Sequence, residues 1–396
     1  MERRIIHLNI ADFSVAVERL LDTSLKGKPL IIAHPSPRAV VSDMSDEAYA
    51  DGVHKGMLLS TAQRRCRSAL VLPPRPEQYH KALQRCLEHA ARYSPLVERS
   101  SGAGHRFLDV TGTARLFGPA PDIGWRLRNS LRQDLGLDPI WSVGSNKLIA
   151  KVASRLVKPR GEYIVGGGEE IPFLAPLPLN LLPGIFQSDL LQLQHVNIQR
   201  VHQLTALSVQ ELAILCGQRA QHLYQCVRGI DPSPVLPSGP ANANYTHQHL
   251  FVPDTNEERL VRAARTSLVQ QMGHSLRQEQ LGCRRLAITL GYTDGVMLTR
   301  QATSKAPLDD DTALTTLACT ALYRAWQRRI RLRQISLTCS LLQHPVQQLS
   351  LLSAIDPKQQ KNKRLSEAMD SIRSRCGTDK VLRGSQHLAR AGSAAL

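Results

Sequence analysis

The chain is 396 residues long, 42% hydrophobic and 21% charged, and its formal net charge is +17. This length suffices for about two to four domains, and the positive excess favours a polyanionic partner, nucleic acid above all. The eight cysteines form no C-x-x-C pair, which argues against a zinc site and a disulfide framework. The sequence has no long apolar run or signal-peptide pattern, so we expect a cytoplasmic, nucleoid-associated protein with reduced thiols and no membrane contact.

The N-terminal part is predicted to alternate short strands and helices. Ile5, Ile6 and Leu8 form an apolar run typical of a buried strand, which we expect Asp12 to end before a helix begins near Phe13. Further short strands are predicted within 25–33 and from Ala39 onward, followed by helices over 76–94 and 122–135.

Within the segment 141–161, the sequence predicts a strongly basic helix that Ser145 can cap. Its cations recur at helical spacing, at Lys147, Lys151, Arg155 and Lys158. Four positive charges on one helix face repel one another unless they meet phosphates, so we expect DNA or nucleotide phosphate there. The alternative is a merely solvated basic face.

The C-terminal half begins with short helices over 172–235 and a Pro-, Gly- and Asn-rich linker over 236–246. Residues 247–343 then predict a sheet backed by two helices. The helices are expected at 258–278 and 312–330, and the strands at RRLAITLGYTDG and RQISLTCSLLQ. Lys and Arg outnumber Asp and Glu in this region, which suits a surface that follows a DNA strand.

Several motifs, in this order along the chain, resemble the Y-family (translesion) DNA polymerases: HLNIADFSVAVE, VVSDMSDEAYADGVHKGM, YSPLVE with LDVTG, and SNKLIAKVAS with KP. The resemblance implies a multidomain α+β fold with right-hand polymerase architecture. It places the palm at 1–20 and 80–170, the fingers at 21–79, the helix-hairpin-helix thumb at 171–235, the linker at 236–246, the little finger at 247–343 and the tail at 344–396.

The catalytic positions of the family are degenerate in this chain. Its metal-binding carboxylates fall at Asn9, Gly104 and His105. Its steric-gate aromatic falls at Ser14, and its triphosphate contacts fall at Asp46 and Tyr49. Polymerase chemistry needs two Mg²⁺ ions held by carboxylate oxygens, so the resemblance carries over no catalytic residue and no metal ligand.

Nearby carboxylates do not repair the loss. Glu98 and Asp109 match flanking family positions, and residues 99–108 contain no carboxylate. Asp12 is the obvious substitute, but strand alternation from Asn9 would turn it to the opposite face. In the thumb, Gly184 matches a hairpin glycine, whereas Phe186 and Asn197 replace two others, so a packing role is expected there.

The tail contains a candidate sliding-clamp motif. Gln348, Leu349, Ser350, Leu351 and Leu352 resemble the consensus Q-L-[SD]-L-F, in which an extended peptide offers a hydrogen-bonding Gln and two apolar anchors. A plain extension of the preceding strand is the alternative.

Taken together, the resemblance points to the catalytically degenerate, ImuB-like branch of the family. We hypothesise a noncatalytic translesion-synthesis adaptor that binds primer-template DNA, the sliding clamp, an error-prone polymerase and a RecA-like accessory protein, without a cofactor. Three alternatives stay open: an active polymerase with relocated metal ligands that would use Mg²⁺, a DNA-binding module without a clamp role, and a partner-binding subunit with vestigial DNA contacts.

Overall fold

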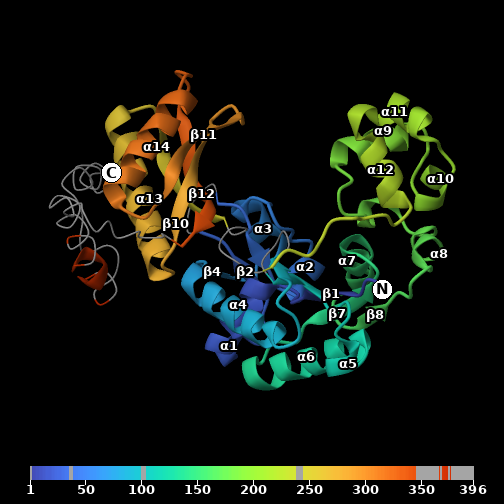
Figure 1. Ribbon diagram of the computed structural model, residues 1–396. Coiled ribbons are helices and arrows are strands. Elements are labelled where there is room, and N and C mark those ends of the chain that lie inside the picture. Colours follow the sequence, from blue (N-terminus) through green and yellow to red (C-terminus); the bar gives the residue numbers. More distant parts are fainter. Residues whose placement is uncertain are drawn as a thin grey trace, which may run out of the picture. The chain divides into compact units, whose positions relative to one another are not determined.

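The computed structural model describes residues 2–34, 39–99, 104–237 and 244–344, together with 365, 368–372 and 375. The chain divides into two compact units, Met1–Ser238 and Gly239–Leu396 (Figure 1). The clamp-motif residues 348–352 lie outside the described residues. Within the described part of the chain, no helix is long and apolar enough to cross a membrane.

The first unit is built on a five-stranded sheet with the strand order β5-β6-β1-β7-β8. Its strands are β1 (Ile5–Asn9), β5 (Val97–Arg99), β6 (His105–Asp109), β7 (Ile140–Gly144) and β8 (Glu162–Ile164). Strand β1 runs antiparallel to both β6 and β7, and all of its residues are buried. The strand predicted at the N-terminus is therefore confirmed, and it forms the centre of the sheet.

Both faces of this sheet are covered, which explains why β1 has no exposed residue. Helices α1 (Phe13–Leu21), α4 (Pro76–Ala91) and α6 (Ala120–Leu135) bury one face in a shared apolar core. Helix α7 (Lys147–Leu156) packs on the other face, against β7 and β1 (Figure 1). A short helix, α5 (Ala114–Phe117), precedes α6.

A small sheet with the order β3-β2-β4 lies beside α1 and has its own core. It consists of β2 (Leu30–Ile32), β3 (Asp43–Met44) and β4 (Leu70–Leu72), with η1 (Thr23–Leu25), α2 (Asp46–Ala50) and α3 (Leu59–Arg65) around it. The strand predicted from Ala39 is reduced to the two residues of β3. The reason is that Ser45 caps α2, where its hydroxyl accepts a hydrogen bond from the Ala48 N–H.

The short helices predicted over 172–235 are confirmed. They are α8 (Glu170–Leu174), η2 (Leu179–Leu181), α9 (Gln187–His195), α10 (Val201–Thr205), α11 (Val209–Cys216), η3 (Gly217–Arg219) and α12 (Ala220–Val227). Their core includes Leu148 and Val152 of α7, so this segment packs directly on the basic helix.

The second unit is a four-stranded antiparallel sheet in the order β11-β10-β12-β9 with two helices on one face. Its elements are β9 (Tyr245–Thr255), α13 (Glu258–Gln278), β10 (Gly282–Tyr292), β11 (Met297–Leu308), α14 (Asp311–Ala325) and β12 (Leu332–Gln343). The predicted sheet backed by two helices is confirmed. The two additional strands, β9 and β11, are the edge strands, and their polar, largely exposed sequences explain why they were not predicted.

Candidate functional site

The first feature of the site is the pairing of Asn9 and His105, which lie directly opposite each other at the adjoining ends of β1 and β6. Asn9 is 1% exposed, and its side-chain amide nitrogen has no hydrogen-bond partner among the described residues. Two of the three positions that hold metal-binding carboxylates in the Y-family polymerases therefore lie side by side. In this chain they are occupied by an amide and an imidazole.

The third position, Gly104, is a buried glycine with φ +89°. Its carbonyl accepts a hydrogen bond of 3.1 Å from the Ile10 N–H, which draws the two chain segments together. A Cβ at position 104 would lie 2.8 Å from the Ile10 carbonyl oxygen and 2.9 Å from Phe13 Cβ. An aspartate therefore does not fit this position without a backbone shift.

A chain of hydrogen bonds fixes the protons of the two histidines near this site. The Ser154 hydroxyl donates to the Lys151 carbonyl at 2.9 Å, so it accepts from His7 Nδ1 at 2.7 Å. The other nitrogen of His7, Nε2, then accepts from His105 Nδ1 at 3.3 Å. Burial keeps the pKa of His7 well below its ordinary value, and burial with nearby cations lowers the pKa of His105 to about 4.

These residues do not fit Mg²⁺, which needs several hard oxygen ligands and a compensating negative charge. Asn9 is neutral, Gly104 has no side chain, and His105 is a neutral imidazole whose nitrogen prefers softer metals. In the described residues, no group of three His, Cys, Asp or Glu side chains is placed to hold a metal ion.

The prediction that strand alternation turns Asp12 away from Asn9 is wrong in its premise, because Asp12 is not part of a strand. Strand β1 ends at Asn9, and Asp12 has left-handed backbone angles, φ 43° and ψ 51°, at the N-cap of α1. Burial raises the pKa of Asp12 to about 7, together with the negative charge of Asp43 and a hydrogen bond with Asp46.

Asp43, which the sequence analysis did not single out, completes this acidic group. Its carboxylate accepts a hydrogen bond from the Ser14 N–H at 3.0 Å and pairs with Lys55 Nζ at 2.7 Å. The only sequence signal for Asp43 is its position two residues before Ser45, the cap of α2. Because Asp43 lies 29 residues from Ser14 in the chain, its role depends on the tertiary fold.

The two positions that correspond to triphosphate contacts are also placed by α2. Asp46 is exposed and contacts Asp12, so it is not simply a solvated helix residue. Tyr49 is 55% exposed and packs edge-on against His54. The region thus presents carboxylates, and its lysine at position 55 is already paired with Asp43. Such a surface repels a triphosphate.

The raised pKa of Asp12 makes a stability prediction. The folded protein holds the Asp12 proton up to about pH 7, whereas the ordinary pKa of an aspartate is 3.8. The stability that the protonated Asp12 contributes is therefore fully present below pH 3.8, and it is lost as the pH rises from there through about 7. Asp12→Asn keeps a residue that tolerates left-handed angles. We expect the variant to gain about 2 kcal/mol relative to wild type between pH 4 and pH 8, after allowance for solvent screening. Urea unfolding at several pH values measures this difference.

A matched control for this prediction is Glu77→Gln, which removes an exposed carboxylate of the same unit. Its stability difference from wild type should stay within about 0.5 kcal/mol at every pH. A pH-independent difference for Asp12→Asn as well would show that Asp12 ionises normally.

Helix α7 is capped by Asn146 rather than by Ser145, and it ends at Leu156, so the predicted helix face stops before Lys158. The Asn146 side chain accepts a hydrogen bond from the Ile149 N–H at 3.0 Å. The first cation of the helix is already neutralised: Lys147 Nζ lies 3.0 Å from Glu98 Oε2 and donates to the Pro234 carbonyl at 2.9 Å. The four predicted phosphate contacts are therefore not equivalent, because one has a carboxylate partner inside the protein.

The other three cations gather near the histidine pair. The charges of Lys151, Arg155 and Lys158 each contribute to the low pKa values of His7 and His105. Arg155 Nη1 donates to the Leu181 carbonyl at 2.5 Å, and burial lowers the pKa of the Lys151 ammonium group. Lys151 also lines a cavity of about 290 Å³ that extends to Gly184 and His222.

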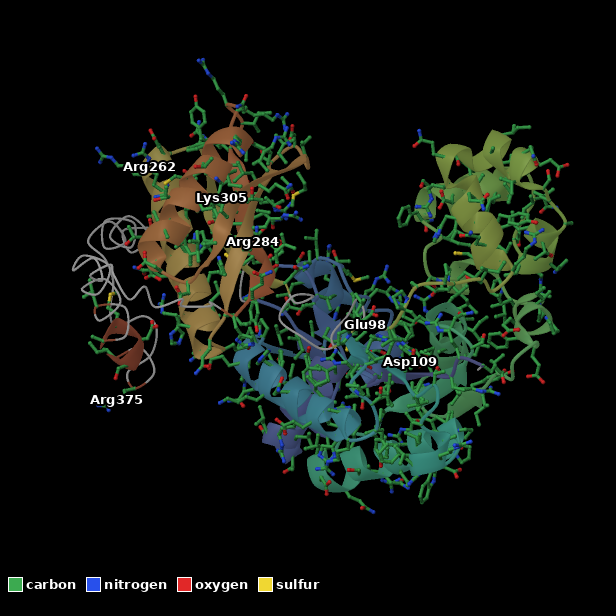
Figure 2. All side chains as sticks on the ribbon, viewed as in Figure 1. Glu98, Asp109, Arg262, Arg284, Lys305 and Arg375 are labelled. Atoms are coloured by element: carbon green, nitrogen blue, oxygen red, sulfur yellow. The ribbon has the colours of Figure 1, made fainter. Side chains whose placement is uncertain are left out.

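Glu98 and Asp109, labelled in Figure 2, serve the local structure. Besides its pair with Lys147, the Glu98 carboxylate accepts a hydrogen bond of 2.8 Å from the Leu236 N–H. Asp109 Oδ1 accepts one of 2.9 Å from the Thr111 N–H and thereby closes the turn after β6. Both carboxylates therefore have partners that hold the fold.

The hairpin around Gly184 is packed by an arginine. The Arg219 guanidinium lies 3.7 Å from the centre of the Phe186 ring, donates to the Gly184 carbonyl and pairs with Asp189 at 3.0 Å. Phe186 is 59% exposed. This arrangement agrees with the expected packing role of the hairpin.

Comparison with known proteins places this geometry in a family. Residues 8–155 match the model of the impB/mucB/samB family, and residues 244–351 match that of its C-terminal domain. The DNA polymerase IV of Desulfatibacillum aliphaticivorans is 31% identical over 383 residues, which are 96% of each chain. The DNA polymerase IV of Halorhodospira halophila is 30% identical and covers 89% of this chain and 99% of its own.

Solved structures agree on the fold. A Y-family DNA polymerase chimera of Dbh and Dpo4 has a TM-score of 0.71 at 20% identity, covering 85% of this chain and 98% of its own. DinB from Sulfolobus solfataricus has a TM-score of 0.65 at 20% identity, with the same shares covered. The α+β polymerase fold expected from the sequence is thereby confirmed, and the chain belongs to the impB/mucB/samB family of Y-family DNA polymerases.

Proposed function

We propose that this chain is a noncatalytic, DNA-binding member of its family that acts in translesion synthesis as an adaptor, like the ImuB-like branch. The observation that carries the proposal is the geometry at Gly104, where a Cβ would lie 2.8 Å from the Ile10 carbonyl oxygen. The backbone there has no room for the carboxylate that the metal site of the family requires. Asn9 and His105 supply no substitute charge.

The nucleotide side of the site supports the same proposal. The phosphates of an incoming nucleotide need hydrogen-bond donors and positive charge. Here Asp12, Asp43 and Asp46 form an acidic group, and Asp43 already uses Lys55 and the N–H of Ser14. The serine at position 14 also offers no aromatic ring that could screen the sugar of a nucleotide.

DNA binding is supported by the net charge of +17 and by Lys151, Arg155 and Lys158 beside the former metal site. The second unit adds a polar sheet face. On it, the hydroxyl groups of Thr289 and Thr299 lie 2.8 Å apart, and those of Thr246 and Thr338 lie 2.9 Å apart. Arg284 and Lys305, labelled in Figure 2, lie on neighbouring strands of this sheet.

The partners of the adaptor follow from the resemblance. The relatives named above are DNA polymerases, so primer-template DNA is the first ligand that we assign. The sliding clamp is assigned through residues 348–352, and an error-prone polymerase and a RecA-like protein are assigned through the ImuB-like branch.

One observation favours a second candidate, an active polymerase with relocated metal ligands. Asp12 lies close to the carboxylates of Asp43 and Asp46, and a proton on Asp12 at neutral pH could be exchanged for a cation. Against this, no three such side chains in the described residues are placed to hold a metal ion. The ion pair of Asp43 with Lys55 at 2.7 Å argues against this candidate, because a metal would have to displace the lysine.

The deciding experiment is primer extension by the purified protein on undamaged and abasic templates, with Mg²⁺ and then Mn²⁺, beside a duplex-binding assay at several salt concentrations. We expect no extension with either metal, and DNA affinity that falls steeply with salt because phosphate contacts release counterions. An Asp43→Asn variant serves as a test of the second candidate. Templated extension by the wild type that this variant lacks would overturn the noncatalytic proposal.

A further inference from the structure

A short segment of the tail is held on the second unit by one carboxylate. Residues 368–372 are helical, and Asp370 accepts hydrogen bonds from Arg277 Nε at 2.6 Å and from Arg277 Nη2 at 3.1 Å. Its Oδ1 also lies 3.1 Å from His274 Nδ1. The two parallel bonds to a guanidinium form the strongest and most directional ion-pair geometry available to a carboxylate.

The surface that receives the tail is also held in place by contacts that do not involve the tail. Arg277 lies in the last turn of α13, and its Nη1 donates to Asp311 Oδ1 at 2.9 Å and to the Asp309 carbonyl at 2.7 Å. These two bonds hold the guanidinium against the start of α14. The remaining edge of the planar fork, Nε and Nη2, is then presented to Asp370 in a fixed orientation.

Glycine at position 273 leaves room for this arrangement. One turn before Arg277 on α13, a Cβ at this position would lie 2.9 Å from Arg277 Nη1 and still closer to Asp311 Oδ1. A helix-interior glycine costs stability, and here it allows Arg277 and Asp311 to meet across the helix surface.

The tail contact is largely removed from solvent. The side chains of Arg277 and Asp370 are 15% and 17% exposed, and that of Asp311 is 2% exposed. Burial alone would raise the pKa of Asp370, but Arg277 and His274 hold it below its ordinary value. The carboxylate is thus charged, paired and shielded, unlike the exposed pair of Arg262 with Glu258 on the same helix.

We propose that the described tail residues between 365 and 375 form a latch that docks through Asp370 onto the ends of α13 and α14. Strand β12 ends at Gln343 and Asp370 is held on the second unit, and residues 348–352 fall between these two points in the sequence. The part of the proposal that concerns clamp binding rests on the proposed function. The docking itself does not.

Undocking should affect clamp binding through the freedom of this segment. A peptide tethered at both ends reaches fewer extended conformations than one tethered at a single end, so a partner that binds it in extended form meets the bound shape less often. We therefore expect release of the latch to tighten clamp binding about threefold, by removing a restraint rather than adding a contact.

The latch is tested on the full chain by limited trypsin digestion, with cleavage after Arg373 and Arg375 followed by mass spectrometry. Asp370→Asn keeps the shape of the side chain but removes its charge. Because proteolysis follows the population of the undocked state, we expect cleavage to become faster on the order of tenfold. Asp379→Asn, which makes the same change nine residues further along the tail, should cleave at the wild-type rate.

Thermal unfolding of both variants shows whether the second unit keeps its fold, and the proposal predicts that it does. Equal cleavage rates for wild type, Asp370→Asn and Asp379→Asn would overturn the latch. Clamp affinity is measured separately, with Leu351→Ala combined with Leu352→Ala as the clamp-binding control. Faster cleavage of Asp370→Asn without clamp binding in any variant would keep the latch and overturn only the clamp role.

Discussion

Gly104→Asp is expected to destabilise the protein by about 3 kcal/mol, and a variant that restores all three family carboxylates is expected to remain inactive. Position 104 has φ +89°, which an aspartate adopts only with strain, and its Cβ would press on the Ile10 carbonyl and on Phe13. Chemical unfolding measures the stability, and primer extension by Asn9→Asp combined with Gly104→Asp and His105→Glu measures the chemistry.

Two control variants separate the causes. Gly104→Ala carries the backbone strain and the Cβ contact without the charge, so it should lose nearly as much stability as Gly104→Asp. Asn9→Asp combined with His105→Glu leaves the glycine in place and should fold, but it lacks the third carboxylate. Loss of less than about 1 kcal/mol in Gly104→Asp would mean that the segment opens readily and that our account of the missing site is wrong.

Reversal of two lysines is expected to have the largest effect on DNA binding. Lys151→Glu combined with Lys158→Glu should weaken duplex binding about a hundredfold near 0.1 M salt and reduce the slope of log K against log salt by about two. We leave Lys147 out of this variant because its ammonium group is paired with Glu98. Fluorescence anisotropy at several salt concentrations gives both quantities.

The control for this reversal is Lys26→Glu combined with Lys28→Glu. Both lysines are exposed near η1, and the double variant changes the net charge of the protein by the same amount. It should lose no more than about threefold in affinity, which is the effect of net charge alone. If the two double variants weaken binding equally, the cations around His105 have no special part in DNA binding.

Features set by local periodicity could be predicted from the sequence. The helix expected at 258–278 has these bounds in the structure, as α13, because its apolar residues recur at helical spacing over five turns or more. The strand at Ile5 and the helices after it are local patterns too. The edge strands β9 and β11 are polar on both faces for much of their length, so alternation gave no signal there.

Features that depend on pairs distant in the chain could not be predicted. Lys147 and Glu98 are 49 residues apart, and no spacing rule along α7 indicates that the first cation has a carboxylate partner. Asp12 was misplaced because strand β1 ends at Asn9 and Asp12 itself has left-handed backbone angles, so strand alternation does not extend to it. The sequence shows directly that carboxylates are missing at three family positions. Only the backbone conformation of the folded protein shows why position 104 has no room for a side chain.

The hydrogen bonds from His105 through His7 to Ser154 run in one direction only, because Ser154 donates to a backbone carbonyl that can only accept. This direction fixes the proton of the His105 imidazole on Nδ1 and leaves Nε2 without a proton. The other nitrogen, Nε2, carries a lone pair that stays unprotonated at neutral pH, because burial and the charges of nearby lysines and an arginine lower the pKa of His105 to about 4. At the position where the family holds a metal ligand, the protein therefore offers an uncharged hydrogen-bond acceptor in a positive field. Such a site favours binding of a hydroxyl group or a water molecule next to a phosphate, and it repels a bare cation.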